Sequence, residues 1–295
     1  MMDYDNRKFN SKSSVNILFR FASLIFAALF TAGCAKSLPA ADVNKKSDPY
    51  EGVNLNELMK GTEGTFVFLD VKNQTRLVHD KKRAETRFTP YSTFKIPHTL
   101  IALETGVATG PEAEIKWDQE KYPKEEWWDT NLKPRGLIWD QNHTISSAFA
   151  NSCVWYYKET AKKIGAEKMK EMVDKFNYGN RDISSAIDSF WLGESLEISA
   201  VEQVDFLEKV VNKELPLKET TYTDGLTVFK RESRDGKTLY AKTGGGKDIG
   251  WFVGFITDRD NSYIFAFNMP GTFEETADRK IEVPMKILHE LKVWQ

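Results

Sequence analysis

Strongly apolar strands near both ends of the chain constrain the fold of this 295-residue protein most. Near the N-terminus, a short helix is predicted at 54–60, and residues 72–75 predict a turn between two strands. The predicted strands comprise residues 65–71, a second run through Leu77 and Val78, and residues 239–242, 250–257 and 263–268. Strands that are apolar along their whole length need cover on both faces. The pattern therefore predicts one antiparallel sheet that is built from both chain ends and flanked by helices.

The middle of the chain carries helical signals instead. Apolar residues recur at spacings of three and four over 146–164 and 166–176, and Ser199 with Glu202 has the spacing of a capping box. A further helix is predicted at 279–293. We therefore predict a mixed α/β (α+β) fold over residues 50–295. Its helical region, 91–215, is inserted between the sheet regions 50–90 and 216–295.

The first 33 residues have the layout of a secretory signal peptide. Basic residues precede an apolar run at 21–32, which ends in small residues before Cys34. The run is too short to span a membrane comfortably, since a span needs roughly 20 apolar residues. Lipidation of Cys34 and ordinary cleavage nearby are both compatible with this pattern. We expect a flexible linker at 34–49 and export to the periplasm, either free or as a lipoprotein.

Composition excludes several classes of function. The chain has 41 basic and 43 acidic residues, a net charge of −2, and no long run of one sign, so no nucleic-acid partner is expected. Its four histidines lack zinc-type spacing, and its two cysteines give no disulfide framework. We expect no metal, a buried structural Cys153, no catalytic role for His98, and a structural role for the cluster at 125–128. The sequence carries no signal for oligomeric state.

Ser92 and Lys95 form the first candidate for chemistry. Ser92 is predicted at the start of a helix, which places the Lys95 amine within reach of its hydroxyl one turn later. A lysine activates a serine only when it is uncharged, so its pKa must be lowered by burial. Phe94, Val154 and Trp191 are candidates for that apolar surrounding. The Ser-x-x-Lys spacing alone is a weak signal, because it occurs often by chance.

Lys242-Thr243-Gly244 is the second candidate, and it stands at the end of a predicted strand. The lysine and the hydroxyl can face a cleft there, while Gly244, Gly245 and Gly246 let a substrate lie close to the backbone. Ser-x-x-Lys followed downstream by Lys-Thr-Gly is the signature of penicillin-binding enzymes and serine β-lactamases. The two motifs together are a much more specific signal for these enzymes than either motif alone.

Over residues 50–295 the chain resembles the class D (oxacillinase-type) serine β-lactamases. The resemblance rests on seven segments in matching order, namely 91–97, Ser152-Cys153-Val154, Tyr178-Gly179-Asn180, Phe190-Trp191-Leu192, Ile198-Ser199-Ala200, Lys242-Thr243-Gly244 and 250–254. It implies hydrolysis of β-lactam antibiotics through an acyl-enzyme on Ser92, with antibiotic resistance as the outcome. Val154 departs from the polar residue that other penicillin-recognising families have at this position.

The resemblance also implies roles for the site residues. Lys95 would react with carbon dioxide or bicarbonate to form a carbamate, in a pocket of Phe94, Val154, Trp191 and Leu192, and would then act as the general base. Ser152 would relay a proton toward the leaving nitrogen, and Lys242 would keep the local potential positive. The backbone amides of Gly245 and Ser92 would bind the oxyanion. Thr243, Gly244 and Gly245 would contact the substrate. Thr243 and Arg279 would hold its carboxylate. No other cofactor is implied.

Two other functions remain open from the sequence. A β-lactam sensor is acylated in the same way but does not turn over, and known full sensors carry membrane spans and a zinc protease that this chain lacks. A D-Ala-D-Ala transpeptidase or carboxypeptidase uses the same nucleophile on peptidoglycan. The Trp191 segment and Val154 argue against that enzyme, because these parts are typical of deacylation by water.

Overall fold

The computed structural model describes residues 49–295. The predicted signal peptide at 1–33, the lipidation site at Cys34 and nearly all of the predicted linker lie outside the described residues. Within residues 49–295, no helix is both long and apolar enough to cross a membrane.

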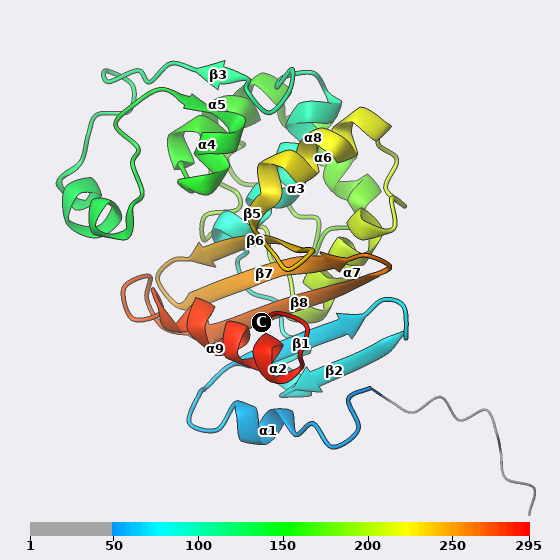
Figure 1. Ribbon diagram of the computed structural model, residues 1–295. Helices are drawn as coiled ribbons and strands as arrows, with labels where there is room; N and C mark the ends of the chain where they lie inside the picture. Colours follow the sequence, from blue (N-terminus) through cyan, green and yellow to red (C-terminus); the bar gives the residue numbers. More distant parts are fainter. Residues whose placement is uncertain (1–48) are drawn as a thin grey trace, which may run out of the picture. The chain divides into compact units, whose positions relative to one another are not determined.

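A six-stranded antiparallel sheet forms the centre of the fold, in the order β2-β1-β8-β7-β6-β5 (Figure 1). Its strands are β1 (Thr65–Asp70), β2 (Thr75–His79), β5 (Lys230–Arg234), β6 (Lys237–Gly245), β7 (Ile249–Asp258) and β8 (Asn261–Pro270). A small second sheet pairs β3 (Glu114–Ile115) with β4 (His143–Thr144). Because β1 pairs with β8, the two ends of the chain do share one sheet, and the predicted fold class is confirmed.

Helices cover both faces of the sheet. They are α1 (Leu55–Leu58), α2 (Lys81–Glu85), α3 (Lys95–Glu104), α4 (Ile145–Ala150), α5 (Val154–Ile164), α6 (Ala166–Phe176), α7 (Ala200–Val211), α8 (Glu219–Phe229) and α9 (Arg279–Glu290). In β1, Val67 and Leu69 pack toward the helical region, whereas Phe66 and Phe68 join the cluster beneath α1 and α9. This alternation explains why the strand is apolar at nearly every position.

Three local differences from the sequence prediction stand out, and the first two bear on the site. The helix predicted over 146–164 is interrupted between α4 and α5, where Ser152 has a left-handed φ of 54°. Ser92 does not begin a helix but lies in the 3₁₀ turn η1 (Tyr91–Phe94), directly before α3. The third difference is α8, which is a helix although its residues lie in the region 216–295 that was predicted to form the sheet. Gly225 weakens the helical signal there, yet packing needs it, because a Cβ would lie 2.8 Å from Leu100.

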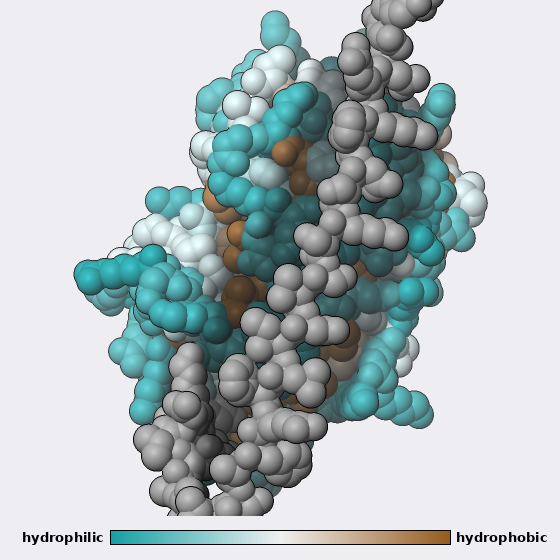
Figure 2. All heavy atoms as spheres, turned by 90° about the vertical axis from the view of Figure 1, so that its right-hand side faces the viewer, coloured by the Kyte–Doolittle hydropathy of each residue, from teal (hydrophilic) through white to brown (hydrophobic). Residues whose placement is uncertain are grey.

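The surface is mainly hydrophilic on the side shown in Figure 2, where hydrophobic side chains are confined to narrow patches between polar ones. The large hydrophobic side chains that are most exposed in residues 49–295 are those of Val78, Trp127 and Ile138, each about two-fifths exposed at 37%, 38% and 41%. A few exposed hydrophobic side chains of this kind are normal on a folded protein.

Candidate active site

The nucleophile segment consists of η1 and the start of α3, and η1 lies against β6. Lys95 is the first residue of α3 and is completely buried, and its Nζ donates to the Ser92 Oγ at 2.9 Å. Ser92 itself is half-buried. The contact expected from the Ser-x-x-Lys spacing is therefore present, although a 3₁₀ turn followed by a helix provides it.

Burial dominates the electrostatics of Lys95. Its Nζ lies 5.1 Å from the centre of the Tyr157 ring, and Phe94 stacks on Trp191 with 5.7 Å between ring centres. This apolar surrounding lowers the pKa of Lys95 to about 7, since desolvation disfavours the ammonium form. A substantial part of the lysine is therefore the neutral amine at physiological pH.

The indole N–H of Trp191 is the feature that tests for a carbamate on Lys95. Trp191 is fully buried, and its Nε1 has no acceptor among the described residues. A buried donor without an acceptor costs about 1–3 kcal/mol. An anionic oxygen next to Lys95 would provide that acceptor, so the residues of this pocket fit the group that the sequence implied.

Ser152 owes its position to the break between α4 and α5. Its left-handed backbone turns the chain between the two helices, and its Oγ accepts from the Lys242 Nζ at 3.1 Å. Burial lowers the pKa of Lys242 well below its usual value, and the nearby charges of Lys95, Arg231 and Lys280 lower it further. A lysine in this state gives up a proton readily, which suits a relay through Ser152.

The end of β6 forms the wall opposite η1. β5 pairs with β6 only as far as Tyr240, so in the described chain the stretch from Lys242 to Gly245 has no strand partner on that side. A Cβ on Gly244 would lie 2.8 Å from the Pro90 carbonyl oxygen, and one on Gly246 would overlap the Tyr91 ring at 2.0 Å. Gly244 and Gly246 therefore let this end of β6 approach the nucleophile segment closely. The sequence predicts that the glycines make room for a substrate, and that role stays a prediction.

A cleft of about 610 Å³ opens beside Ser152, Lys242 and Thr243. Lys280 lines this cleft, is 96% buried at 4% exposure, and lies 3.1 Å from where a Cβ on Gly245 would stand. Arg279, predicted to hold the substrate carboxylate, is exposed and does not line the cleft. The role of Arg279 stays a prediction. Successive residues of a helix point about 100° apart, and Lys280, not Arg279, is the one that lines this cleft.

The structure brings most of the predicted residues together. The contacts above form two pairs, Lys95 with Ser92 and Lys242 with Ser152. Val154 and Leu192 are partly buried against the same core as Phe94 and Trp191. Sequence reasoning missed Arg135, Arg231, Phe273 and Lys280, which line the cleft from separate segments. Only Lys280 carried a usable signal, as the neighbour of Arg279 at a helix start.

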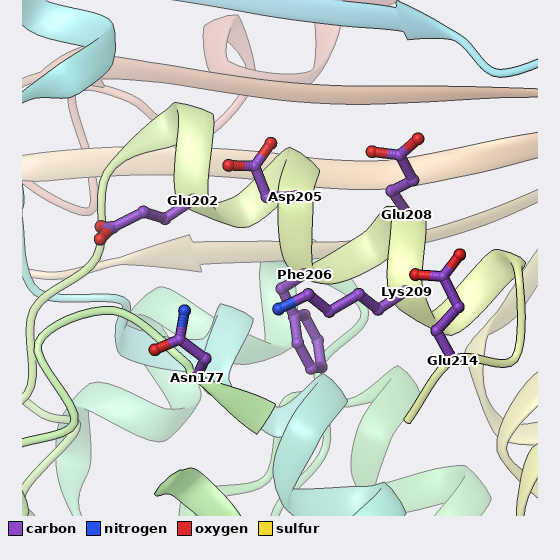
Figure 3. A pocket seen from close by; sticks show the side chains of 7 residues that line it. All are labelled: Asn177, Glu202, Asp205, Phe206, Glu208, Lys209 and Glu214. Carbon is purple, nitrogen blue, oxygen red and sulfur yellow. The ribbon is translucent and has the colours of Figure 1, made fainter. Parts of the chain in front are cut away.

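A second hollow, of about 320 Å³, lies along α7 and is lined by none of the four residues proposed for catalysis (Figure 3). Its carboxylates are largely paired, since Glu202 contacts Arg87 and Asp205 contacts Arg76. It therefore has little free charge for a ligand. Within residues 49–295, no group of three or more His, Cys, Asp or Glu side chains is arranged to hold a metal ion.

Comparison with known proteins agrees with this geometry. The family profile described as the penicillin binding protein transpeptidase domain matches residues 64–289. The probable β-lactamase YbxI of Bacillus subtilis is 34% identical, over 84% of this chain and 89% of its own length. The solved structure of FUS-1 (OXA-85), a class D β-lactamase from Fusobacterium nucleatum, superposes with a TM-score of 0.73 at 34% identity, covering 82% of this chain and 97% of that one. The chain belongs to the class D β-lactamases.

As a class D β-lactamase, the protein is a serine hydrolase that acts on β-lactams, and such enzymes need no metal or organic cofactor. The regulatory protein BlaR1 of Bacillus licheniformis is also similar, with 29% identity over 78% of this chain but only 37% of its own length. The family relationship therefore extends to a regulatory protein, at lower identity than to YbxI.

Proposed function

We propose that this class D β-lactamase hydrolyses penicillin-type antibiotics through an acyl-enzyme on Ser92, with carboxylated Lys95 as the general base for acylation and deacylation, and so gives its host resistance. The observation that carries the proposal is the contact of 2.9 Å between a buried lysine with a lowered pKa and the Ser92 hydroxyl. That contact supplies the activated nucleophile which acyl transfer needs.

In the acylation step, the Ser92 Oγ forms a bond to the β-lactam carbonyl carbon as its proton moves to the base. The carbon–nitrogen bond of the ring then breaks, and the nitrogen takes up a proton from Ser152, which Lys242 replenishes at 3.1 Å. The amides of Ser92 and Gly245 would donate to the oxyanion, and a donor of this kind contributes about 3–4 kcal/mol. Before deacylation, the proton held by the base passes to Lys242, which restores both groups. Water then adds to the ester carbonyl carbon and gives a proton to the base, the bond between that carbon and the Ser92 Oγ breaks, and Ser92 takes the proton back from the base.

Lys95 and Trp191 are the residues that would hold the carboxyl group. When bound, that group supplies an anionic oxygen base in place of an amine. The neutral fraction of Lys95 makes it reactive toward carbon dioxide, and the Trp191 N–H would donate to the product. The rings of Phe94 and Tyr157 exclude water from the same space.

The carboxylate of the substrate would bind between Thr243 and Lys280. Lys280 is buried beside Gly245 and lacks a carboxylate partner in the described chain, whereas Arg279 is exposed. An ammonium at this depth interacts with an anion more strongly than one in open solvent.

Multiple-turnover hydrolysis of a chromogenic β-lactam, with and without bicarbonate, tests the proposal. We expect sustained turnover that rises with bicarbonate and is lost in Lys95→Ala, while the matched control Lys168→Ala, on the exposed side of α6, retains it. A single stoichiometric burst without turnover would contradict hydrolysis and favour a sensor, the candidate that similarity to BlaR1 supports. Aminolysis of D-Ala-D-Ala peptides would favour a transpeptidase.

We also propose that the protein is exported to the periplasm, either free or anchored through Cys34. The apolar run at 21–32 and the small residues before Cys34 support this. Fractionation of cells grown with labelled palmitate would distinguish the two forms. Label that disappears in Cys34→Ala indicates a lipoprotein, and unlabelled protein in the periplasm indicates ordinary cleavage.

A further inference from the structure

The cleft beside Ser152 is lined by far more positive charge than one substrate carboxylate requires. Its basic residues are Arg135, Lys230, Arg231, Lys242 and Lys280, and the acidic residue on its wall is Asp278. The chain as a whole has a net charge of −2, so composition does not explain this concentration of cations. It is a local property of the cleft.

None of these five basic residues forms a salt bridge within residues 49–295. Close neighbours of two of them do, since Lys133 pairs with Asp129 and Asp140, and Arg234 pairs with Glu232. Lys280 is the most telling case, because it is buried and lies within 4.7 Å of the Phe273 ring centre without a carboxylate partner. The fold has thus paired cations next to the cleft with carboxylates and left those that line it without a carboxylate partner in the described chain, although Lys242 donates to Ser152 and Arg135 to the Asn131 carbonyl oxygen.

The cations that line the cleft act on one another. Burial is the main cause of the lowered pKa of Lys242, and the charges of Lys95, Arg231 and Lys280 add to it. Burial likewise lowers the pKa of Lys280 to about 8, with a further contribution from Arg135, while Asp278 and Glu274 act in the opposite direction. The Arg135 guanidinium lies 5.3 Å from the ring centre of Phe273, the same ring that Lys280 approaches. Bound anions would relieve this mutual repulsion, and a partly enclosed cleft concentrates its field.

We propose that the cleft recognises β-lactams that carry a second carboxylate besides the one on the ring, and that Arg135 and Arg231 bind this second group. The inference rests on the proposed function, which assigns the ring carboxylate to Thr243 and Lys280. Two carboxylates would then neutralise cations from the 133–135 turn, β5 and α9 together. The planar guanidinium of each arginine suits a carboxylate, which it can meet with two parallel hydrogen bonds.

A binding measurement that does not depend on turnover tests this inference. Benzoate and benzene-1,3-dicarboxylate differ by one carboxylate, and their dissociation constants can be measured from the shift of the Gly245 amide signal in NMR titrations at low, constant ionic strength. We expect the dicarboxylate to bind about tenfold more tightly, and the difference to fall to about twofold in the double variant Arg135→Gln/Arg231→Gln. Screening of exposed charges is the reason for low salt.

The matched control is Lys133→Gln/Arg234→Gln, which removes the same charge from the same two segments but from residues that already have partners. It should keep the tenfold difference. Equal affinities for the two probes in the unmodified protein, or equal losses in both double variants, would overturn the inference. Tight dicarboxylate binding in a protein without turnover would sink the proposed hydrolysis and leave the second anion site standing.

Discussion

At the scale of single residues, the site depends on groups that burial deprives of water. Lys95, His98 and Trp191 are all fully buried within one aromatic cluster, and the rings of His98 and Trp191 meet at 5.4 Å. The lowered pKa of Lys95 and the Trp191 N–H, which has no acceptor within residues 49–295, both follow from this surrounding. Small changes to one ring should therefore alter the chemistry of the lysine.

Trp191→Phe removes the indole N–H while keeping an aromatic ring against Phe94. We expect the bicarbonate concentration that half-saturates Lys95 to rise roughly ten- to a hundredfold, because one hydrogen bond to an anion contributes about 1.5–3 kcal/mol. The carbamate signal in ¹³C NMR with labelled bicarbonate measures this directly. Trp155→Phe is the control, since that indole donates to the Trp139 carbonyl oxygen away from Lys95. Equal carbamate signals in the wild type and Trp191→Phe would contradict the assignment.

His98 should make stability fall in acid. Burial and the nearby charge of Lys95 lower its pKa from 6.5 to about 3, so between these values the unfolded chain binds a proton that the folded chain refuses. Its contribution to the free energy of unfolding therefore decreases as pH falls from 6.5 toward 3, by about 1.4 kcal/mol per unit. Urea unfolding of the wild type and His98→Asn across this range measures the contribution as a difference in slope. Parallel curves would rule it out.

The site residues that belong to sequence motifs could be predicted. The site residues that depend on how distant segments pack together could not. Ser92, Lys95 and Lys242 stand at fixed spacings that the chemistry needs, and the structure joins Ser92 to Lys95 and Lys242 to Ser152. Whether Arg279 or Lys280 faces the cleft depends on how α9 is rotated against the sheet. No local sequence pattern predicts that rotation.

At the scale of elements, close approach between η1 and the β6–β7 turn shapes the site. The Tyr91 ring occupies the space where Gly246 lacks a side chain, and Tyr91 itself has a left-handed φ of 46°. Two segments 155 positions apart in sequence (246 − 91) are thereby fixed beside the nucleophile. The pair should behave as one packing unit.

Gly246→Ala should destabilise the fold by about 1–3 kcal/mol, because its Cβ would overlap the Tyr91 ring. Removing that ring in Gly246→Ala/Tyr91→Ala should restore part of the loss, with a coupling energy of about 0.5–3 kcal/mol. Urea unfolding of the two single variants and the double variant completes the cycle. Strictly additive effects would mean that the two positions do not touch.

The extents of elements were predicted less well than their existence. β1, β2, β6, β7 and β8 lie where apolar runs predicted strands, whereas β3, β4 and β5 were not predicted. Apolar spacing predicted α6, and the capping box at Ser199 and Glu202 does start α7. The break between α4 and α5 at Ser152 was not predicted, because the apolar spacing continues across it from one helix into the next. What ends α4 is a single left-handed residue, and the sequence offers no glycine there as a signal.

At the scale of the whole molecule, β1 and β8 join the chain ends into one cooperative unit. β8 lies between β1 and β7, and it contributes Ile264 to the core under the helices and Phe265 to the core under α9. Antiparallel pairing from hairpins at both ends was predictable, because near-continuous apolar strands need two covered faces.

Hydrogen exchange should report this unit. We expect amides in β1 to exchange as slowly as those in β7 and β8, since all three lie inside the sheet, while β2 and β5 at its edges exchange faster. Exchange followed by mass spectrometry of peptic fragments provides the comparison. Much faster exchange in β1 than in β8 would show that the N-terminal hairpin opens independently.

The strand order also fixes when activity can arise during synthesis. β1 precedes its inner neighbour β8 in the chain by the whole helical region. Ser92 likewise precedes β6, the strand opposite it, by most of that region. A chain made only as far as the helical region therefore carries the nucleophile without a working site around it, and activity can arise only after β6, β7 and β8 have been added.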